Sequence, residues 1–394
     1  MELSELSVAN IGHHEVFKIE EVQSVYIPNI PGPASTDEVR YSRLFQSVDL
    51  STNFYFSYTY DLSRTLQENA LSLKNLKFNK NLYHPKLESE KKFIWNNYLL
   101  KPFRDNAITD KWVVEIVHGY VGQQIVELPV AKLAVILIGR RSSEYAGTRF
   151  LKRGMNQNGS CANDVETEQI VWDMQTTPCI ETGHFTAYVQ RRGSIPLFWS
   201  QDPSTRGVVG KPAVIVDIVE PNALTTAAHF KELRRKYGYP ISVVNLVKRR
   251  GGPKVRDEKL LHSQFLKTVK YLNEFMKPGK CIDYISFDVA RCNKDGQVLP
   301  RLEQIGLKLS LRQGWFQSFK PLKVRQLLKH PVFDNFTPIY SEDGEMLLQS
   351  GISRTNCVDC LDRTNVAQFG LAKATLGFQL YSMGYTSEPV ISTG

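Results

Sequence analysis

The sequence predicts an α/β protein in which a mixed sheet is flanked by helices. From about residue 116 onward, apolar runs of strand length alternate with helical segments. A polar loop then separates the last apolar run from a long helix near the carboxyl end. Because such alternation is typical of a buried, mostly parallel or mixed sheet, residues 116–394 are expected to form one layered domain. Residues 1–115 lack this regular alternation and are expected to form a separate part.

The first part of the chain contains one predicted strand and two predicted helices. The aromatic run Phe54–Tyr60 consists of residue types that favour a strand. The spacing of apolar residues predicts helices over Leu62–Leu73 and Lys91–Leu100.

The second part contains five predicted strands and three predicted helices before the polar loop. The strands are Leu133–Ile138, Tyr188–Gln190, Ala213–Val219, Ile241–Val247 and Ile282–Phe287. The helices are Ala223–Tyr237, Asp257–Met276 and Arg301–Leu311. Gly238 and Pro278 follow the first two helices, as helix stops should. The last unit is predicted as a strand at Met346–Leu348, the polar loop, and a helix over Asn365–Met383.

Composition indicates a folded protein with an anionic partner. Apolar residues make up 42% of the 394 residues and charged residues 23%, which argues against the disordered and fibrous classes. The net charge is +9, and nine basic residues lie between Lys231 and Arg256, with Glu232 as the one acidic residue among them. This basic stretch indicates an anionic partner, such as phosphates, nucleic acid or an acidic membrane surface, with a solvated face as the alternative. Of these partners, phosphates and the membrane surface are preferred, and no nucleic-acid partner is expected.

The sequence also predicts a reduced, cytoplasmic protein. The first residues are polar, unlike a signal peptide, and six cysteines are too few for a disulfide scaffold in a chain of this length. The longest apolar runs, Leu133–Ile138 and Ala213–Val219, are much shorter than a membrane span. Any work on membranes is therefore expected to take place from the surface.

The polar loop holds a cysteine and an arginine at a spacing that suits phosphate chemistry. Five residues separate Cys357 from Arg363, and Thr364 follows. A loop that enters a helix presents several backbone N–H groups and the positive end of the helix dipole to one point. The same field lowers the pKa of a cysteine thiol, so Cys357 can attack phosphorus as a thiolate. The forked guanidinium of Arg363 suits two non-bridging oxygens, and the Thr364 hydroxyl suits the departing sulfur.

The reaction also needs an acid for the leaving alcohol, and Asp359 and Asp362 are the two candidates. Asp362 directly precedes Arg363, whose guanidinium favours the ionised carboxylate. Asp359 is therefore the preferred acid, and Asp362 is expected to orient Arg363. The other loop residues, which are expected to surround the bound phosphate, are Asn356, Val358, Cys360 and Leu361.

Cys357 and Cys360 also form a C-x-x-C pair, which is found in redox and zinc sites. The sequence contains no second pair of this kind and no two histidines at zinc-ligand spacing, so half of a zinc site is disfavoured. A redox pair leaves Arg363 and Thr364 without a role. The phosphatase mechanism itself requires no cofactor and no metal, and it is compatible with assistance from Mg²⁺.

The polar loop from Arg354 to Asn365 resembles the signature of the Sac-domain phosphoinositide phosphatases. Four further segments resemble the same family in the expected order, and they are Phe93–Asn96, Arg140–Gly154, Ala162–Gln169 and Gln190–Asp202. The resemblance implies a phosphoinositide phosphatase with a cysteine-phosphatase core that works through a phospho-cysteine.

Other residues within these segments are candidates for binding or for packing in the core. The basic cluster that is a candidate for binding inositol phosphates or the bilayer consists of Arg141, Arg149, Lys152 and Arg153. Glu166 and Glu168 are candidates to align an arginine or a metal, and a structural hydrogen-bonding role is favoured. Trp199 is expected to pack in the core.

Within the family, Phe54–Asp61, Tyr145–Gly154 and Ala162–Glu168 look most like the endosomal and vacuolar branch. That likeness implies removal of the 5-phosphate of phosphatidylinositol 3,5-bisphosphate by a peripheral protein of endosomal, vacuolar or lysosomal membranes. It also implies two partners, a HEAT-repeat scaffold and the phosphatidylinositol 3-phosphate 5-kinase. Residues 1–115 resemble a Sac N-terminal subdomain without its first strands, and family members continue beyond the position of residue 394 in the catalytic part. A weakly active scaffold component and a protein phosphatase with the same chemistry are the alternatives.

Overall fold

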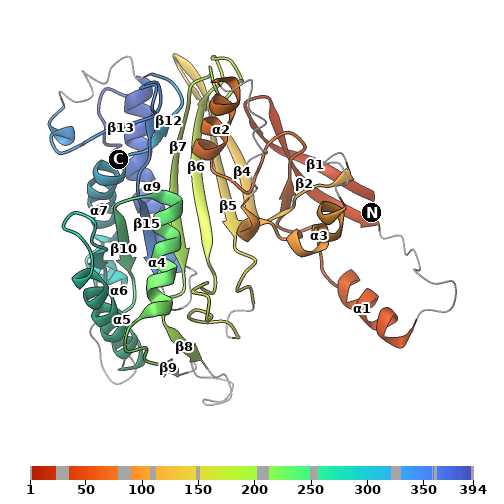
Figure 1. The fold of residues 1–394 in the computed structure, drawn as a ribbon. Helices are drawn as coiled ribbons and strands as arrows, with labels where there is room; N and C mark the ends of the chain where they lie inside the picture. Colours follow the sequence, from red (N-terminus) through yellow and green to blue (C-terminus); the bar gives the residue numbers. More distant parts are fainter. Residues whose placement is uncertain are drawn as a thin grey trace.

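The computed structural model describes residues 2–23, 35–78, 90–106, 112–147, 151–201, 213–248, 256–320, 330–356, 358 and 362–391. Its main feature is a large mixed sheet that runs through the molecule (Figure 1). The N-terminal strands form one end of this sheet, and the helices of the C-terminal part pack around the other end.

The N-terminal part contributes three strands, which are β1 (Glu2–Ile11), β2 (His14–Gln23) and β3 (Phe54–Phe56). β1 and β2 form an antiparallel hairpin, and β3 pairs with β2 on one side and with β4 (Val117–Leu128) on the other. The strand predicted over Phe54–Tyr60 therefore stops after three residues, although Tyr60 is buried in the core as an aromatic residue should be. Residues before and after position 115 share one continuous sheet.

The helical elements of this part are α1 (Thr36–Gln46), α2 (Leu66–Phe78), the 3-10 turn η1 (Lys91–Phe93) and α3 (Asn97–Asp105). The single helix predicted over Lys91–Leu100 is wrong in its middle. Ile94 forms a β-bridge with Val117, and the Trp95 N–H donates to the Ile116 carbonyl at 2.8 Å. These sheet-like bonds hold the backbone out of the helical conformation, so η1 and α3 are separate elements.

The centre of the sheet is an antiparallel meander of β4, β5 (Ala131–Arg141), β6 (Val165–Asp173) and β7 (Phe185–Gly193). Along one half of β7 the antiparallel order continues through β12 (Phe316–Gln317), β14 (Leu347–Leu348) and β13 (Ile339–Tyr340). Along the other half, β7 pairs in parallel with β15 (Ile352–Asn356), which is followed by β10 (Ile241–Asn245) and β11 (Asp283–Ser286). The predicted mixed sheet is confirmed, but most of its pairs are antiparallel, because apolar periodicity does not encode strand direction.

Helices cover both faces of the parallel strands, and they are α4 (Leu224–Tyr237), α5 (Arg256–Glu274), α6 (Val289–Lys294), α7 (Val298–Gln313) and α9 (Asp362–Met383). In β10, Val243 belongs to the same apolar cluster as Phe230 of α4 and Phe265 of α5. The next residue, Val244, belongs to a cluster with Leu302 of α7 and Leu371 of α9. A strand buried on both faces appears in the sequence as a continuous apolar run, which is why β10 is predictable.

The smaller elements complete the described chain. β8 (Phe198–Gln201) and β9 (Val214–Ile218) form a separate antiparallel pair, and η5 (Pro331–Phe333) is a 3-10 turn. Trp199 of β8 is buried in the core, as predicted. Within the described ranges, the model contains no helix that combines the length and the apolar character needed to cross a membrane.

The strand that leads into the polar loop is β15, and the prediction that Met346–Leu348 fills this position is wrong. β15 consists of Ile, Ser, Arg, Thr and Asn, and all five residues are buried. Its polar side chains bond to neighbouring elements, as when the Ser353 Oγ donates to Gln313 Oε1 of α7 at 2.9 Å. A search for apolar runs misses such a strand, because its burial depends on partners that are distant in the sequence.

Candidate functional site

The candidate site lies where the carboxyl ends of the parallel strands meet at one edge of the sheet. Asn245 of β10 is in register with Ser286 of β11 and with Asn356 of β15, and Asn356 is in register with Gly193 of β7. The chain passes from Asn356 into residues 357–361 and enters α9 at Asp362. The predicted catalytic loop 357–363 therefore joins a buried parallel strand to the N-terminus of a 22-residue helix. This is the arrangement in which α/β proteins bind phosphate.

Some of the predicted site residues lie outside the described residues, namely Cys357, Asp359, Cys360, Leu361 and Arg149. Asn356 and Val358 are described, and both are buried. The Arg153 Nη1 donates to the Val358 carbonyl at 2.7 Å, and its Nε donates to Gln201 Oε1 at 2.8 Å. Arg153, with only 4% of its surface exposed, is therefore a buried side chain that holds the backbone at Val358.

Arg363 and Thr364 lie in the first turn of α9. The Arg363 Nη1 is 3.5 Å from the carbonyl oxygen of Leu246 and 3.7 Å from Glu258 Oε2. The Leu246 N–H in turn donates to the Asn356 carbonyl at 2.9 Å, so Arg363 lies near the ends of β10 and β15. Thr364 is fully buried, and its Oγ1 has no hydrogen-bond partner. Asp362 is exposed at the start of the helix.

Arg141 and Lys152, the other two described members of the predicted basic cluster, make local contacts. The Arg141 Nη2 donates to the Gly147 carbonyl at 3.0 Å, and the Lys152 ammonium lies 4.8 Å from the centre of the Tyr145 ring. Of the three described members, Arg153 is the one that contacts the catalytic loop directly through a described bond.

The basic stretch Lys231–Arg256 is only partly available to a membrane, contrary to its prediction as one charged surface. The Lys236 side chain is 4% exposed, and its ammonium lies 3.2 Å from Glu166 Oε2. Lys231 and Arg235 are exposed on α4, and residues 249–255 lie outside the described residues. The spacing of basic residues along a helix does not show which of them point to solvent and which one pairs with a buried carboxylate.

The partners of Lys236 form an ionic network that the sequence interpretation missed. Arg140 is fully buried and lies 3.1 Å from Glu166 Oε1 and 2.5 Å from Glu168 Oε2. Burial alone would raise the pKa of Glu166, but Lys236 and Arg140 outweigh it and lower the pKa to about 2. Both glutamates bond to Arg140, which fits the favoured structural role and also the alternative that they align an arginine. The available signal was the pair of glutamates two residues apart in one strand, a spacing that places them on one face.

A second set of buried ion pairs joins Lys92 of the N-terminal part to β7. The Lys92 ammonium lies 3.1 Å from Asp164 Oδ2, and the Arg191 Nη2 lies 2.5 Å from the same carboxylate. Burial opposes ionisation of Asp164, but Arg191 and Lys92 hold its pKa far below the usual range. The described residues contain no cluster of three or more side chains suited to hold a metal ion.

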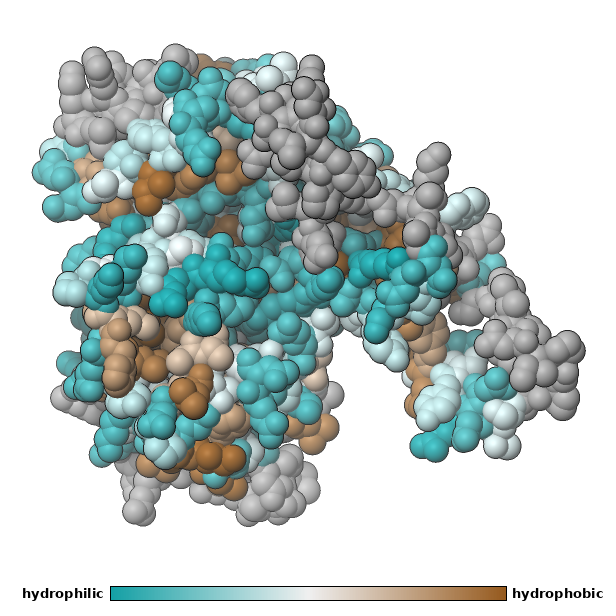
Figure 2. All heavy atoms as spheres, in the orientation of Figure 1, coloured by the Kyte–Doolittle hydropathy of each residue, from teal (hydrophilic) through white to brown (hydrophobic). Residues whose placement is uncertain are grey.

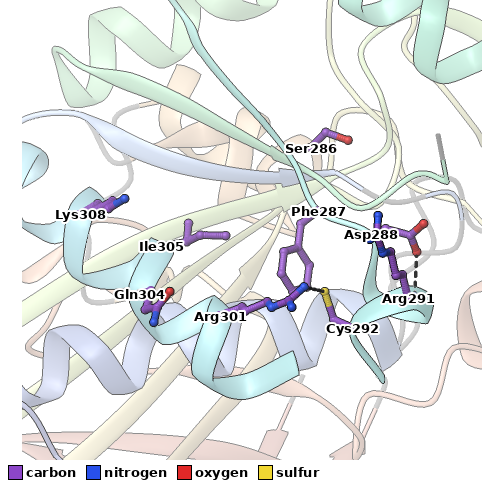
Figure 3. A pocket seen from close by; sticks show the side chains of 9 residues that line it. All are labelled: Ser286, Phe287, Asp288, Arg291, Cys292, Arg301, Gln304, Ile305 and Lys308. Atoms are coloured by element: carbon purple, nitrogen blue, oxygen red, sulfur yellow. Dashed lines mark hydrogen bonds between the residues drawn. The ribbon is translucent and has the colours of Figure 1, made fainter. Parts of the chain in front are cut away.

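A cavity of about 530 Å³ opens beside the carboxyl end of β11, between α6 and α7 (Figure 3). Phe287, Cys292 and Ile305 contribute its apolar lining, and its cations are Arg291, Arg301 and Lys308. Asp288 is the acidic residue of the lining, and its carboxylate already accepts the Arg291 backbone N–H at 3.2 Å. Because Ser286 and Asn356 are in register with the same residue of β10, the cavity lies along the sheet edge that carries the catalytic loop.

Comparison with known proteins identifies the family of this chain. A family model described as the SacI homology domain matches residues 4–294. The chain is 36% identical, over 97% of its length, to the polyphosphoinositide phosphatase of Schizosaccharomyces pombe, of which it covers 43%. It is 36% identical to phosphoinositide phosphatase SAC5 and 33% identical to phosphatidylinositol-3-phosphatase SAC1, both of Arabidopsis thaliana. These matches cover 98% and 96% of this chain and 50% and 45% of the two relatives, so the chain spans about half the length of its curated relatives.

The predicted resemblance to the Sac family is confirmed by these matches, whereas the assignment to the endosomal and vacuolar branch stays a prediction. The matched residues begin within β1 and extend past β11, and they include β10, near whose end Arg363 lies. The chain belongs to the SacI homology domain family.

Proposed function

We propose that this protein is a phosphoinositide phosphatase that acts through a phospho-cysteine at Cys357. The observation that carries the proposal is the unit of buried strand, loop and helix that brackets Cys357 between Asn356 and the first turn of α9. Arg363 contacts the carbonyl of Leu246 at the end of β10, and Thr364, whose hydroxyl has no hydrogen-bond partner, follows Arg363 in the chain. The relatives named above are called phosphatases of phosphoinositides, which supports the same activity here.

The reaction has two balanced steps. In the first, the Cys357 thiolate attacks phosphorus, the bond from phosphorus to the inositol oxygen breaks, and the leaving oxygen takes a proton from a carboxylic acid. In the second, water attacks the phospho-cysteine, the carboxylate takes a proton from that water, and the bond between sulfur and phosphorus breaks. Arg363 stabilises the charge on the non-bridging oxygens, and Thr364 donates to the departing sulfur. Asp359 is the preferred acid and Asp362 the alternative. No step requires a cofactor, and Mg²⁺ remains an optional aid.

The substrate proposed is phosphatidylinositol 3,5-bisphosphate, with loss of the 5-phosphate. The cavity beside β11 supports a headgroup with a second phosphate, because three cations line it on the edge that carries the loop. We place the enzyme on the surface of endosomal, vacuolar or lysosomal membranes, with a HEAT-repeat scaffold and the phosphatidylinositol 3-phosphate 5-kinase as partners.

A scaffold component of that complex is the second candidate function, and α1 favours it. This helix has no buried residue, and Figure 2 shows it standing away from the body of the molecule. Tyr41 and Leu44 are 69% and 56% exposed on it, which leaves apolar surface for a partner chain.

The purified chain is expected to release inorganic phosphate from vesicles that contain phosphatidylinositol 3,5-bisphosphate. A panel with the three monophosphates of phosphatidylinositol and a phosphotyrosine peptide defines the substrate class. Release from the peptide alone would make the protein a protein phosphatase. No release from any member of the panel would overturn the enzymatic proposal in favour of the scaffold role.

The double variant Arg301→Gln, Lys308→Gln tests whether the cavity beside β11 holds the second phosphate. We expect kcat/KM to fall about tenfold for the bisphosphate and less than about twofold for a monophosphate, because a charge-assisted hydrogen bond contributes about 1.5–3 kcal/mol. Lys270→Gln removes an exposed cation of α5 outside the cavity and serves as the matched control. Equal losses on both lipids would show that the cavity does not select for a second phosphate.

A further inference from the structure

A patch of exposed apolar side chains lies in β9 and at the start of α4. Its members are Ile215, Ile218, Val219 and Leu224, which are between 43% and 70% exposed and fall within residues 215–224. Figure 2 shows hydrophobic side chains at the lower end of the molecule, where Figure 1 places β8 and β9. Single exposed apolar residues are ordinary on protein surfaces, whereas four within so short a segment indicate a docking surface. We call these four residues the apolar tip.

The pairing of β8 with β9 explains why the apolar tip faces outward. Val214 and Val216 pack against the apolar core, so Ile215 between them lies on the opposite face of the strand. Strict alternation would then turn Ile218 inward. The register of the two strands shifts at a bulge, however, which leaves Asp217 as an extra residue of β9. Ile218 is exposed as a consequence.

The apolar tip lies at the end of the sheet that carries the candidate site. Arg153 donates to Gln201 Oε1 of β8 at 2.8 Å and to the Val358 carbonyl at 2.7 Å, so one buried side chain joins β8 to the segment that follows β15. The first turn of α4 is attached at the same end, because the Thr226 Oγ1 donates to the carbonyl of Pro196, between β7 and β8, at 2.8 Å. A surface that binds the apolar tip therefore lies close to the candidate site.

Cations follow the apolar tip along one face of α4. Leu224, Ala228, Lys231 and Arg235 are all exposed, and their spacing of four, three and four residues places them in one row. At about 1.5 Å per residue, Lys231 lies about 10 Å and Arg235 about 16 Å from Leu224 along the helix axis. Apolar faces of helices that lie on membranes are buried about 5–10 Å deep, so long cationic side chains at these heights reach the lipid phosphates.

The two carboxylates within residues 215–224 both accept hydrogen bonds from neighbouring residues. Asp217 Oδ1 accepts from the Ser200 Oγ on the adjacent strand at 2.7 Å. The Glu220 carboxylate accepts from the Thr225 Oγ1 at 2.6 Å and from the Thr225 N–H at 3.2 Å, which holds the turn that leads into α4. These bonds give both acids a local role in the fold, so the row on α4 presents positive charge to a partner.

We propose that the apolar tip inserts into the surface of an acidic lipid bilayer, with Lys231 and Arg235 in contact with lipid phosphates. The inference rests on the proposed function in one respect, the choice of a bilayer as the occupant. An enzyme whose substrate is a membrane lipid must hold its active site against the membrane, and the apolar tip lies at that end of the sheet. An apolar edge followed by a row of cations is typical of surfaces that bind anionic lipids.

Co-sedimentation with vesicles of phosphatidylcholine and phosphatidylserine, without phosphoinositide, measures this docking independently of catalysis. The triple variant Ile218→Thr, Val219→Thr, Leu224→Gln removes apolar surface at exposed positions and keeps β-branched residues at the end of β9. We expect its Kd for these vesicles to be at least about tenfold higher than that of the wild type. Leu224→Trp should bind at least as tightly as the wild type, because the indole keeps the tip apolar.

Phe275→Gln is the matched control, because it removes an exposed apolar side chain from the opposite end of the sheet. Phe275 follows α5, which leads from the carboxyl end of β10 back to the amino end of β11. We expect this variant to bind vesicles as the wild type does.

The double variant Lys231→Gln, Arg235→Gln tests the contribution of the cations. Each cation near an acidic membrane strengthens binding about fivefold, so we expect a Kd about 25-fold higher on the acidic vesicles. On vesicles of phosphatidylcholine alone, the double variant and the wild type should bind equally. Lys277→Gln, which removes an exposed cation at the opposite end of the sheet, serves as the matched control.

Several results would overturn the inference. If the folded triple variant binds the acidic vesicles as tightly as the wild type, the apolar tip does not dock on a bilayer. A dimer that the wild type forms without lipid and the triple variant does not form would assign the tip to a second copy of the chain. Should the triple variant fail to fold, Leu224→Gln and the double variant still decide, because both change exposed residues of α4 alone.

Hydrolysis separates this inference from the proposed function. The triple variant is expected to lose about tenfold in kcat/KM on vesicles with phosphatidylinositol 3,5-bisphosphate and less than about twofold on its water-soluble short-chain form. A wild type that hydrolyses the short-chain lipid but does not sediment with vesicles would reject the inference and keep the proposed function. Vesicle binding that depends on the tip, without hydrolysis of any lipid, would reject the proposed function and leave the inference standing.

Discussion

The Cys357→Ser protein is expected to release phosphate from phosphatidylinositol 3,5-bisphosphate at least about 1,000-fold more slowly than the wild type. A serine hydroxyl is not ionised near neutral pH, and the mechanism supplies no base to activate it, so the phosphoenzyme cannot form at a useful rate. The substitution leaves Arg363 in place. We therefore expect the variant to bind substrate vesicles as tightly as the wild type, measured by co-sedimentation.

Arg363→Lys and Cys281→Ser accompany this measurement. Arg363→Lys keeps the charge but loses the planar fork, and a loss of about 100-fold in kcat is expected from the missing contact to a non-bridging oxygen. Cys281, whose Sγ contacts the Lys277 carbonyl, lies before β11 at the opposite end of the strand, so its change to serine should leave activity intact. Substantial activity in Cys357→Ser would exclude a phospho-cysteine mechanism.

The Arg140→Met protein is expected to lose about 3–5 kcal/mol in its free energy of unfolding, because the substitution leaves two buried carboxylates without their shared cation. Glu166 and Glu168 are both 0% exposed, so water cannot take the place of the guanidinium. Arg140 also donates to the carbonyls of Leu62 and Arg64, at 2.5 and 2.8 Å. The residues just before α2 therefore lose their attachment to β5, and early cleavage by protease is expected there.

Urea denaturation followed by circular dichroism measures the loss in stability. Arg104→Met is the matched control, because the ion pair of Arg104 with Glu115 spans 2.6 Å but lies at the surface, where such a pair contributes about 1 kcal/mol or less. A double variant that also replaces Glu168 by glutamine should recover part of the loss, since it removes the charge of Glu168, whereas Glu166 keeps its ion pair with Lys236. If Arg140→Met unfolds at the same urea concentration as the wild type, the network does not stabilise the fold.

Elements with a clear local pattern are predictable from the sequence. β10 is an uninterrupted apolar run, and α9 follows a loop with a clear polar boundary. β15 is different, because Arg354 and Asn356 give it the composition of a loop although both side chains are buried. The direction of the strands could not be predicted from the sequence either, since the apolar pattern does not differ between the antiparallel meander and the parallel strands.

The sequence by itself determined the family and the order of the predicted catalytic residues, because the positions of Cys357, Arg363 and Thr364 relative to one another are set by covalent spacing along one short stretch of chain. Only the tertiary structure shows which charged side chains form ion pairs in the interior of the protein. Lys236 and Arg140 look like surface cations until Glu166 is placed between them by strand pairing and helix packing. Arg354 of β15 likewise finds a hydrogen-bond acceptor in His229 only because α4 brings the two side chains together across 125 residues of chain. Pairing of buried polar groups depends on distance and direction in space, and neither is encoded locally in the residues that are paired.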